Sequence, residues 1–357
     1  MIKVSDSTLV DCRKCNLDKI ADKHLSKVNP RSKKNNQPIK RSIYSKIVEF
    51  KGEVDSDDYL NQHCNGDETV RERHSNFLNY FIEQDGIYLD SIITATPDLL
   101  KSIIEDINDI LIESDFFVDG VYTSLYKKTK NNLFAYSDYR KTKGCIEVYE
   151  ELLGSSVYCF YCNSASLDII SKERHNKRNT KKALFDLDHF YLRSKYPYLS
   201  LCFYNLIPCC HSCNSSIRGT LDFDIETHIN PYFTSFDEHY TFSVNEAELA
   251  SLIMGAESPI TEIYVNKLET STRNLDRTVE DLLINEKCNL ELQKINSLGS
   301  SYIRHKFRKA AELELFVELV YGYRYERIPE DKKYIHEYQH SKLQLDFIEQ
   351  LESSPEE

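Results

Sequence analysis

The side chains best suited to bind a metal or move a proton gather between residues 157 and 219. This stretch contains two Cys-x-x-Cys pairs, formed by Cys159, Cys162, Cys210 and Cys213. Asp188 and His189 are adjacent between the two pairs, and Asn214 directly follows the last cysteine. Thiolates, a carboxylate, an imidazole and an amide in this order indicate a metal-bound knuckle beside a polar reaction centre.

The cysteine spacing predicts a structural zinc site. Each Cys-x-x-Cys turn presents two thiolates on one side of a knuckle, and four thiolates are typical of zinc that has no open coordination position. Closing such a site would hold together two otherwise separate segments. A redox pair is the alternative, but it normally begins a helix in a βαβ unit, and neither pair has that context. Cys209 is a conceivable substitute ligand that we interpret as a buried thiol.

Two short strands and a helix must position the polar residues. Apolar and polar residues alternate over residues 185–190, which predicts a strand, and residues 206–208 predict a second strand after a loop. A helix is expected to begin near Cys210 and to carry Asn214 and Arg218 on successive turns. We therefore expect a small ββα unit.

Such a unit could do hydrolytic chemistry on a phosphate. It can place Asp188 and Asn214 side by side as oxygen ligands for one Mg²⁺ or Mn²⁺ ion. His189 would face the other side of the phosphate, where a neutral imidazole can take a proton from water. The alternative for His189 is a core histidine bonded to Asp188.

In these motifs residues 157–219 resemble the HNH endonucleases, the ββα-metal family, and in particular its zinc-bearing members. The resemblance implies that His189 is the general base and that Asp188 and Asn214 hold the catalytic Mg²⁺ or Mn²⁺. It also implies that the side chain of Asn205 ties the loop backbone and so aims the histidine. Asn214 stands where many members have histidine, and an amide oxygen suits a hard cation such as Mg²⁺.

The loop between the two strands and the following helix supply candidate nucleic-acid contacts. Arg193 and Lys195 lie near Tyr196 and Tyr198, a mixture of cations and aromatics that can grip a phosphate backbone. Arg218 is a candidate phosphate clamp one turn beyond the metal-binding asparagine. Ordinary loop surface and core packing are the alternative for these side chains.

Short motifs in and after the core further resemble HNH proteins of bacterial anti-phage modules, of the Septu and retron-associated types, in which the nuclease works beside an ATPase. These motifs are residues 186–190, 196–197, 204–208, 210–214 and 228–232. This resemblance implies a DNA endonuclease that acts as a defence effector with a protein partner. RNA, such as a tRNA, is the alternative substrate of the same site. A non-catalytic zinc module that binds nucleic acid or bridges proteins, and a helical interaction protein stapled by zinc, are alternatives of another class.

From composition we expect a folded, cytoplasmic chain. The chain has 357 residues, 41% of them apolar, and its sequence shows no membrane span or signal peptide. The net charge of −12 is unfavourable for nucleic-acid binding, but positive charge gathers in residues 1–46 and 172–182. The overall acidity would keep the protein off nucleic acid until it is recruited.

We expect an α+β fold in which the ββα core lies between mostly helical flanks. The expected divisions are a basic, loosely structured segment at 1–65, a helical region at 66–153, the zinc-bearing core at 154–235 and a helical region at 236–357. Helices are predicted at residues 69–84, 97–111, 133–153, 306–321 and 334–351, and from Pro259 onward. Cys12 and Cys15 form a third pair; a second zinc site with His24 or with His63 and Cys64 is one interpretation, and free surface thiols are the other.

Overall fold

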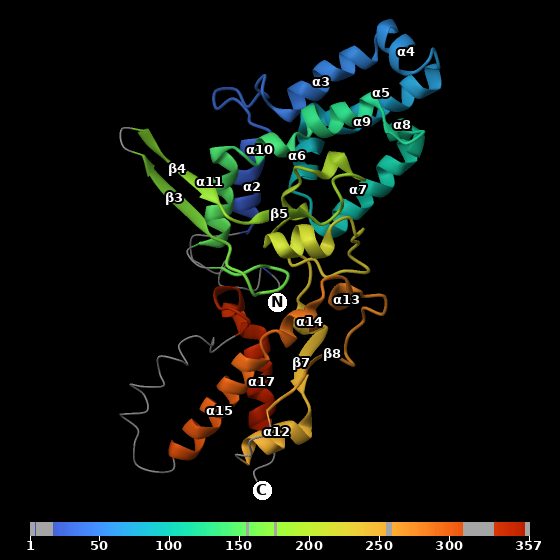
Figure 1. Ribbon diagram of the computed structural model, residues 1–357. Coiled ribbons are helices and arrows are strands. Elements are labelled where there is room, and N and C mark those ends of the chain that lie inside the picture. The colour runs from blue at the N-terminus through green and yellow to red at the C-terminus, as the bar shows by residue number, and fades with distance from the viewer. Residues whose placement is uncertain are drawn as a thin grey trace.

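The computed structural model describes residues 4, 17–154, 157–174, 177–254, 259–309 and 332–353, with only the backbone for residues 172–174, 177–179 and 304–309. Helices of the amino-terminal half lie at one end, the short strands of the cysteine-rich segment in the middle, and the carboxy-terminal elements at the other end (Figure 1). Four two-stranded antiparallel sheets accompany the helices in the described part of the chain. The predicted α+β class is therefore confirmed.

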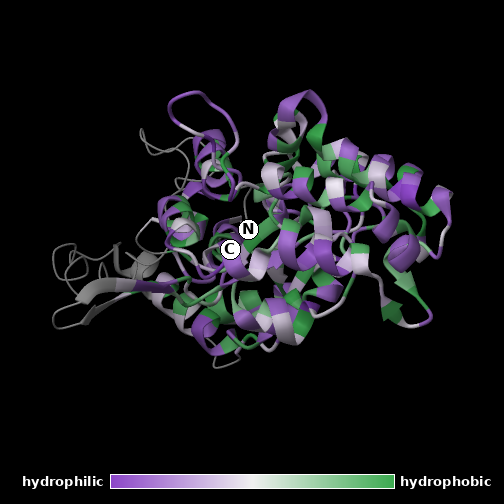
Figure 2. Cartoon of the chain, turned by 90° about the horizontal axis from the view of Figure 1, so that it is seen from above, coloured by the Kyte–Doolittle hydropathy of each residue, from purple (hydrophilic) through white to green (hydrophobic). Residues whose placement is uncertain are grey.

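The amino-terminal half is a layer of short helices. They are α2 (Leu17–Val28), α3 (Ile43–Val54), α4 (Asp57–His63), α5 (Glu68–Ile82), η2 (Glu83–Gly86), α6 (Ile87–Ile93), α7 (Pro97–Ile110), α8 (Glu113–Phe116), α9 (Ser124–Lys128), η3 (Thr129–Leu133), α10 (Tyr136–Tyr139) and α11 (Lys143–Leu153). A small hairpin interrupts them, formed by β1 (Phe117–Val118) and β2 (Val121–Tyr122). Individual helices carry hydrophobic and hydrophilic positions on different sides, as amphipathic helices do (Figure 2).

Helices α5 and α7 agree with the sequence-based prediction, whereas α11 covers only residues 143–153 of the helix predicted at 133–153, because η3, α10 and turns precede it. Pro97 occupies the first turn of α7, where its missing N–H costs no hydrogen bond. Thr142 caps α11, since its side chain accepts a hydrogen bond from the Cys145 amide at 3.1 Å. Gly154 ends α11 with a positive φ of 62°.

The prediction of a loosely structured segment over residues 1–65 is wrong for residues 17–28, 43–54 and 57–63. Helices α2, α3 and α4 occupy them, and α2 packs on α11. The buried side of α2 includes Ile20 and His24, both fully buried. A histidine in the apolar stripe and many flanking lysines conceal this helix in the sequence, because its burial depends on partners distant in the chain.

The middle of the chain contains two hairpins. The first, β3 (Ile169–Arg174) with β4 (Lys177–Ala183), extends from the body of the protein (Figure 1). The second pairs β5 (Asp186–His189) with β6 (Leu206–Cys209) in the antiparallel register that sets Asp186 opposite Cys209 and His189 opposite Leu206. Its loop carries η4 (Pro197–Leu199) and η5 (Phe203–Asn205), and η6 (Ser212–Arg218) follows as a short π-helix. Both strands of the second hairpin were predicted.

The carboxy-terminal part mixes helices with one further hairpin. Its elements are η7 (Phe236–Glu238), β7 (Tyr240–Val244), α12 (Glu246–Ile253), β8 (Ile263–Lys267), α13 (Thr278–Asp281), α14 (Ile284–Asn289), α15 (Leu292–Lys309), η8 (Lys332–Glu337) and α17 (Ser341–Ser353). Strand β7 pairs with β8, and α17 packs against β7.

Two carboxy-terminal predictions need correction. No helix begins at Pro259; the chain there runs into β8, where Ile263 and Val265 alternate with more exposed residues. Residues 334–351 divide between η8 and α17 instead of forming one helix. The predicted helix at 306–321 overlaps α15 only up to Lys309, and its remainder lies outside the described residues.

None of the helices in the described part of the chain has both the length and the apolar character needed to span a bilayer.

Candidate functional site

Four cysteines from two distant turns converge on one point. The Sγ atoms of Cys159, Cys162, Cys210 and Cys213 all lie within 4.8 Å of one another. The Cys162 and Cys210 sulfurs are 3.9 Å apart, close to the roughly 3.8 Å expected between sulfurs that surround one Zn²⁺ at Zn–S distances of about 2.3 Å. The cluster could therefore hold a metal ion such as zinc, as the spacing predicted.

Hydrogen-bond donors point at these sulfurs. The Cys210 amide lies 3.3 Å from the Cys159 sulfur, and the Cys213 amide lies 3.5 Å from the Cys210 sulfur. Lys287, on α14, places its Nζ atom 2.9 Å from the Cys213 sulfur. A bound metal requires thiolates, and nearby N–H and ammonium groups stabilise their negative charge. The contact of Lys287 was not anticipated, because nothing in the sequence relates α14 to the second knuckle.

The other cysteines of the described residues lie outside this cluster. Cys209 is fully buried, and burial raises the pKa of its thiol, consistent with the interpretation as a buried thiol. Both ring nitrogens of His24 are engaged, by the Leu201 carbonyl and the Tyr139 hydroxyl, so this histidine is not free to bind a second zinc. Cys12 and Cys15 lie outside the described residues.

His189 ends β5 with its ring held in one orientation. Its Nε2 atom lies 3.2 Å from the carbonyl oxygen of Ser200, which can only accept a hydrogen bond, so Nε2 carries the proton. The Tyr136 ring packs edge-on against the imidazole, with centroids 4.4 Å apart. Burial, helped by the charge of Arg193, lowers the pKa of His189 to about 3. The imidazole is thus neutral near pH 7, with Nδ1 unprotonated.

Asp188 faces the interior and not His189. Its Oδ2 atom accepts a hydrogen bond from the Tyr161 hydroxyl at 2.8 Å and forms an ion pair with Arg218 at 3.0 Å. Burial raises the pKa of Asp188, and Arg218 opposes this shift. The alternative of a core pair between the side chains of His189 and Asp188 is therefore not what the structure has, since each has other partners.

The position of Arg218 differs from the expectation of a phosphate clamp. Its side chain is only 2% exposed, and its Nη2 atom donates to the carbonyl oxygens of His189 and Phe190 at 2.7 and 2.8 Å. The guanidinium also lies over the Phe223 ring, 4.5 Å from its centroid. Arg218 therefore anchors the end of β5 from within, because its donors are directed at the chain itself.

Asn214 lies beside Asp186, whereas the sequence-based expectation placed it beside Asp188. Its Nδ2 atom donates to Oδ2 of Asp186 at 3.0 Å, and the exposed His211 contacts the same oxygen through Nδ1 at 2.8 Å. The Asp186 side chain is 34% exposed, so this carboxylate can reach solvent. Asp186 was missed, although its position two residues before Asp188, on the same face of the strand, is the signal that could have found it.

Asn205 is fully buried and ties together the loop between β5 and β6. Its Oδ1 atom accepts from the Tyr191 amide at 2.7 Å, and its Nδ2 atom donates to the carbonyls of Tyr191 and Leu199 at 3.2 and 3.1 Å. The carbonyl that orients His189 belongs to Ser200, the residue after Leu199. By fixing this loop, Asn205 helps to set the position of the imidazole.

Two cations flank His189 without a carboxylate partner in the described part of the chain. Arg193 donates to the Lys130 carbonyl at 3.1 Å and to the Ser137 hydroxyl at 3.0 Å, and its guanidinium lies over the Tyr136 ring. Lys130 donates to the Tyr126 hydroxyl at 3.0 Å. Burial lowers the pKa of both groups. Lys130 was not identified from the sequence, because η3 is distant in the chain from β5.

Lys195, the other predicted contact of the loop, is half exposed. Its ammonium forms an ion pair with Asp222 at 2.7 Å. A surface pair of this kind is weak and exchanges readily with other anions, so Lys195 stays a predicted nucleic-acid contact.

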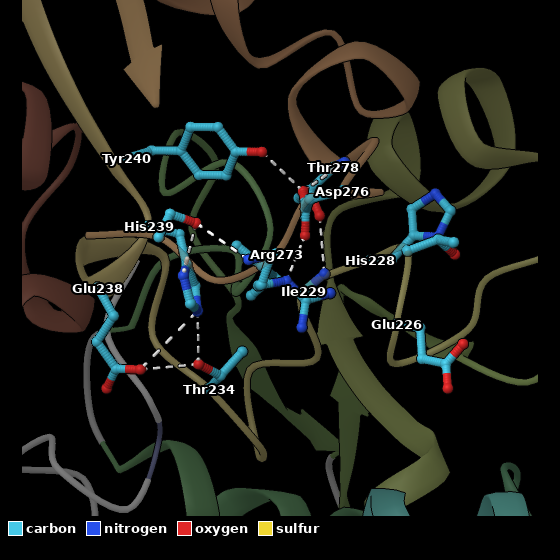
Figure 3. Close-up of polar contacts among 12 residues, drawn as sticks. Glu226, His228, Ile229, Thr234, Glu238, His239, Tyr240, Arg273, Asp276 and Thr278 are labelled. Atoms are coloured by element: carbon cyan, nitrogen blue, oxygen red, sulfur yellow. Dashed lines mark hydrogen bonds and ion pairs between the residues drawn. The ribbon is translucent and has the colours of Figure 1, made fainter. Parts of the chain in front are cut away.

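A polar network joins the segment after η6 to the carboxy-terminal part (Figure 3). The Asp276 carboxylate accepts hydrogen bonds from the Tyr240 hydroxyl and the Thr278 amide, both at 2.9 Å, and from Arg273 at 2.5 Å. Thr278 in turn accepts from the Ile229 amide at 2.7 Å. These groups bond mainly to one another, so we interpret the network as structural.

A second contact links this network to the strand of His189. The His228 ring stacks on Phe223 with centroids 3.8 Å apart, and Phe223 lies beneath Arg218. Arg218 holds the His189 carbonyl. The His228 ring also bonds to Asp281 of α13 at 3.0 Å, so the carboxy-terminal part supports the position of Arg218 through this stack.

No protein-family model, curated protein or solved structure matches the chain.

Proposed function

We propose that this protein is a metal-dependent endonuclease that hydrolyses phosphodiester bonds of DNA, with β5, β6 and η6 acting as an HNH-type ββα unit. The observation that carries the proposal is the arrangement of His189. Its Nε2 proton is committed to the Ser200 carbonyl, which leaves the Nδ1 lone pair free to accept a proton. Core packing alone does not explain why two cations, Arg193 and Lys130, lie near this histidine.

The flanking cations supply the second part of the argument. Arg193 and Lys130 lie close enough to His189 for their charges to lower its pKa, and neither has a carboxylate partner among the described residues. Half-buried cations without counter-charges favour an anionic ligand, and a phosphodiester carries one negative charge per linkage. A phosphate held there would lie next to the imidazole that activates water.

A divalent cation completes the proposed chemistry. Asp186 and Asn214 suit Mg²⁺ or Mn²⁺ better than Asp188 and Asn214, because the Asp188 carboxylate is already paired with Arg218. The ion would supply charge neutralisation at the leaving oxygen. His189 would accept the proton of water, and Asn205 would keep the loop that orients it in place.

Cleavage of supercoiled plasmid by the wild type and by His189→Ala, each with Mg²⁺, Mn²⁺ or EDTA, tests the proposal. We expect conversion to nicked or linear DNA by the wild type with metal, and its loss in the variant and in EDTA. His63→Ala, which removes an exposed histidine, is the matched control and should cleave normally. Cleavage that persists in His189→Ala would overturn the mechanism. A parallel assay with tRNA decides between DNA and RNA.

The biological role is part of the proposal. The motifs of this chain resemble those of anti-phage HNH proteins. This resemblance supports a defence effector that works with a protein partner such as an ATPase. A net charge of −12 weakens encounter with nucleic acid and fits an enzyme that must be recruited before it cuts. Co-expression with the products of adjacent genes, followed by plasmid cleavage, tests this role.

One observation favours a second candidate, a non-catalytic zinc module that binds nucleic acid. The Asp188 carboxylate is enclosed by Tyr161 and Arg218, as in a purely structural core. Under that function, His189→Ala would leave the biological effect unchanged, whereas loss of the zinc-binding cysteines would abolish it.

A further inference from the structure

The β1–β2 hairpin exposes aromatic and aliphatic side chains that a soluble surface normally hides. Phe117 and Tyr122 keep 40% and 39% of their surfaces exposed, and the valines beside them are also exposed. The turn at Asp119 and Gly120, both with positive φ, makes a tight two-residue connection that holds the strands in register. The hairpin directly follows α8, which lies at the periphery of the molecule (Figure 1). An exposed apolar patch of this kind is typical of a binding surface.

The aromatic side chains of the hairpin rest on a rigid base. Tyr122 and Tyr126 are stacked with ring centroids 4.0 Å apart and an interplanar angle of 10°. Two hydrogen bonds hold the Tyr126 hydroxyl: it donates to the Ser194 carbonyl and accepts from Lys130, each at 3.0 Å. Phe117 lies opposite Tyr122 across the hairpin, with centroids 5.1 Å apart. The exposed rings are thus pre-organised to receive a third flat group.

A continuous series of contacts leads from this aromatic pair to His189. The Lys130 ammonium lies 5.8 Å from the Tyr122 ring centroid, and the Lys130 carbonyl accepts a hydrogen bond from Arg193. Arg193 covers the Tyr136 ring, which packs on His189. Aromatic rings and cations therefore alternate along one path that ends at the candidate base.

We propose that Phe117 and Tyr122 form a stacking site for an unpaired nucleobase, and that the adjoining phosphates lie along Lys130 and Arg193. The inference rests on the proposed function and specifies its substrate: the strand is unpaired next to the cleaved bond. Bases stack on aromatic side chains irrespective of sequence, while cations follow the backbone. In a duplex the base faces are covered by neighbouring base pairs, so a paired strand cannot occupy the site.

Charge favours nucleic acid over a protein partner or a second copy of this chain. The Lys130 ammonium lies beside the Tyr122 ring, and Arg193 donates to the Lys130 carbonyl, so two cations adjoin the hairpin. A second copy of the chain is acidic overall, with a net charge of −12. At this surface, however, it would present the same local cations, and like charges repel one another. A polyanion with flat apolar groups complements both features of this surface.

Fluorescence anisotropy with a labelled mixed-sequence oligonucleotide, single-stranded or annealed to its complement, tests the site. All proteins would carry His189→Ala, so binding is measured without cleavage. We expect the single strand to bind more tightly than the duplex, and Tyr122→Ala to weaken single-strand binding roughly 5- to 100-fold, the loss typical of one stacked base. Tyr122→Phe should retain binding, since stacking does not need the hydroxyl.

Tyr264→Ala is the matched control, because Tyr264 on β8 is 38% exposed and lies far along the chain from the hairpin. It should bind like the parent. Unchanged single-strand affinity in both Tyr122→Ala and Phe117→Ala, with unfolding midpoints unaltered, would overturn the stacking site. So would equal affinity for duplex, or a dimer in light scattering that Tyr122→Ala dissociates without any effect on the oligonucleotide. These readouts are independent of plasmid cleavage, so the stacking site can fail while the nuclease stands, and the reverse.

Discussion

The side-chain amide of Asn214 lies 3.0 Å from the carboxylate of Asp186, although the two residues are 28 positions apart in the chain. The contact joins the start of β5 to η6 and creates a partly exposed cluster of oxygen and nitrogen atoms. Asp188, two residues further along β5, is enclosed by Tyr161 and Arg218. The two aspartates of one strand therefore have different surroundings, and substitution can test whether their roles differ.

Asp186→Asn and Asp188→Asn should differ in what they disrupt. We expect Asp186→Asn to reduce Mg²⁺-dependent plasmid cleavage at least about 10-fold with little change in stability, because it weakens the proposed cation site. Asp188→Asn should lower the free energy of unfolding by about 3–5 kcal/mol, because it leaves the buried Arg218 without a counter-charge. Urea denaturation and plasmid cleavage measure the two effects. A stable but inactive Asp188→Asn would instead assign the metal to Asp188.

Zinc should be bound tightly and be needed for the fold. Metal analysis of the purified chain should find zinc, and Cys213→Ser should lose it and unfold at lower temperature, since metal binding contributes directly to folding free energy. Cys209→Ser is the matched control, because it makes the same atomic change in a neighbouring buried thiol outside the cluster. Full zinc content in Cys213→Ser would contradict the assignment of this ligand.

Lys287 should stabilise the zinc site through its contact with the Cys213 sulfur, although the two residues are 74 positions apart in the chain. Replacing it with glutamine removes the ammonium beside the Cys213 sulfur, and we expect zinc to be lost to a chelator at roughly 10-fold lower chelator concentration. Lys294→Gln, at a more exposed lysine paired with Glu291, should leave zinc retention unchanged. Equal retention by both variants would show that the contact does not stabilise the site.

Stability should fall as the pH is lowered from about 6.5 to about 4, through His24. Burial lowers the pKa of this side chain from 6.5 to about 4. In that interval the unfolded chain binds a proton that the native protein does not, so acid favours unfolding, by roughly 3 kcal/mol for this group. Above pH 6.5 both states are neutral and the contribution is fully present. Denaturant titrations between pH 4 and 7 measure the slope.

His24→Gln should flatten part of that slope, because glutamine does not titrate. The remainder would come from the other histidines whose pKa burial lowers, among them His189, His228 and His239. His63→Gln, at an exposed position, should leave the slope of the wild type in place. An unaltered slope in His24→Gln would contradict the prediction.

Local patterns in the sequence were enough to predict the parts of the molecule that depend on near neighbours. The spacing of the cysteine pairs predicted the cluster, because a Cys-x-x-Cys turn brings its two sulfurs together and four thiolates share one metal. Alternation over residues 185–190 and 206–208 predicted β5 and β6. The proline at the start of α7 and the glycine at the end of α11 marked those helices, since both residues restrict or release the backbone locally.

Tertiary structure alone decided which distant groups meet. Residues 17–28 are polar and basic, yet they form a packed helix whose buried side includes His24. Helix propensity alone does not predict such packing. The enclosure of Arg218, the pairing of Asn214 with Asp186 and the approach of Lys287 to Cys213 all join residues from separate elements. Residue type and spacing determine what chemistry a side chain can do; the packing of the whole chain determines the solvent, charges and donors around it, and hence its role.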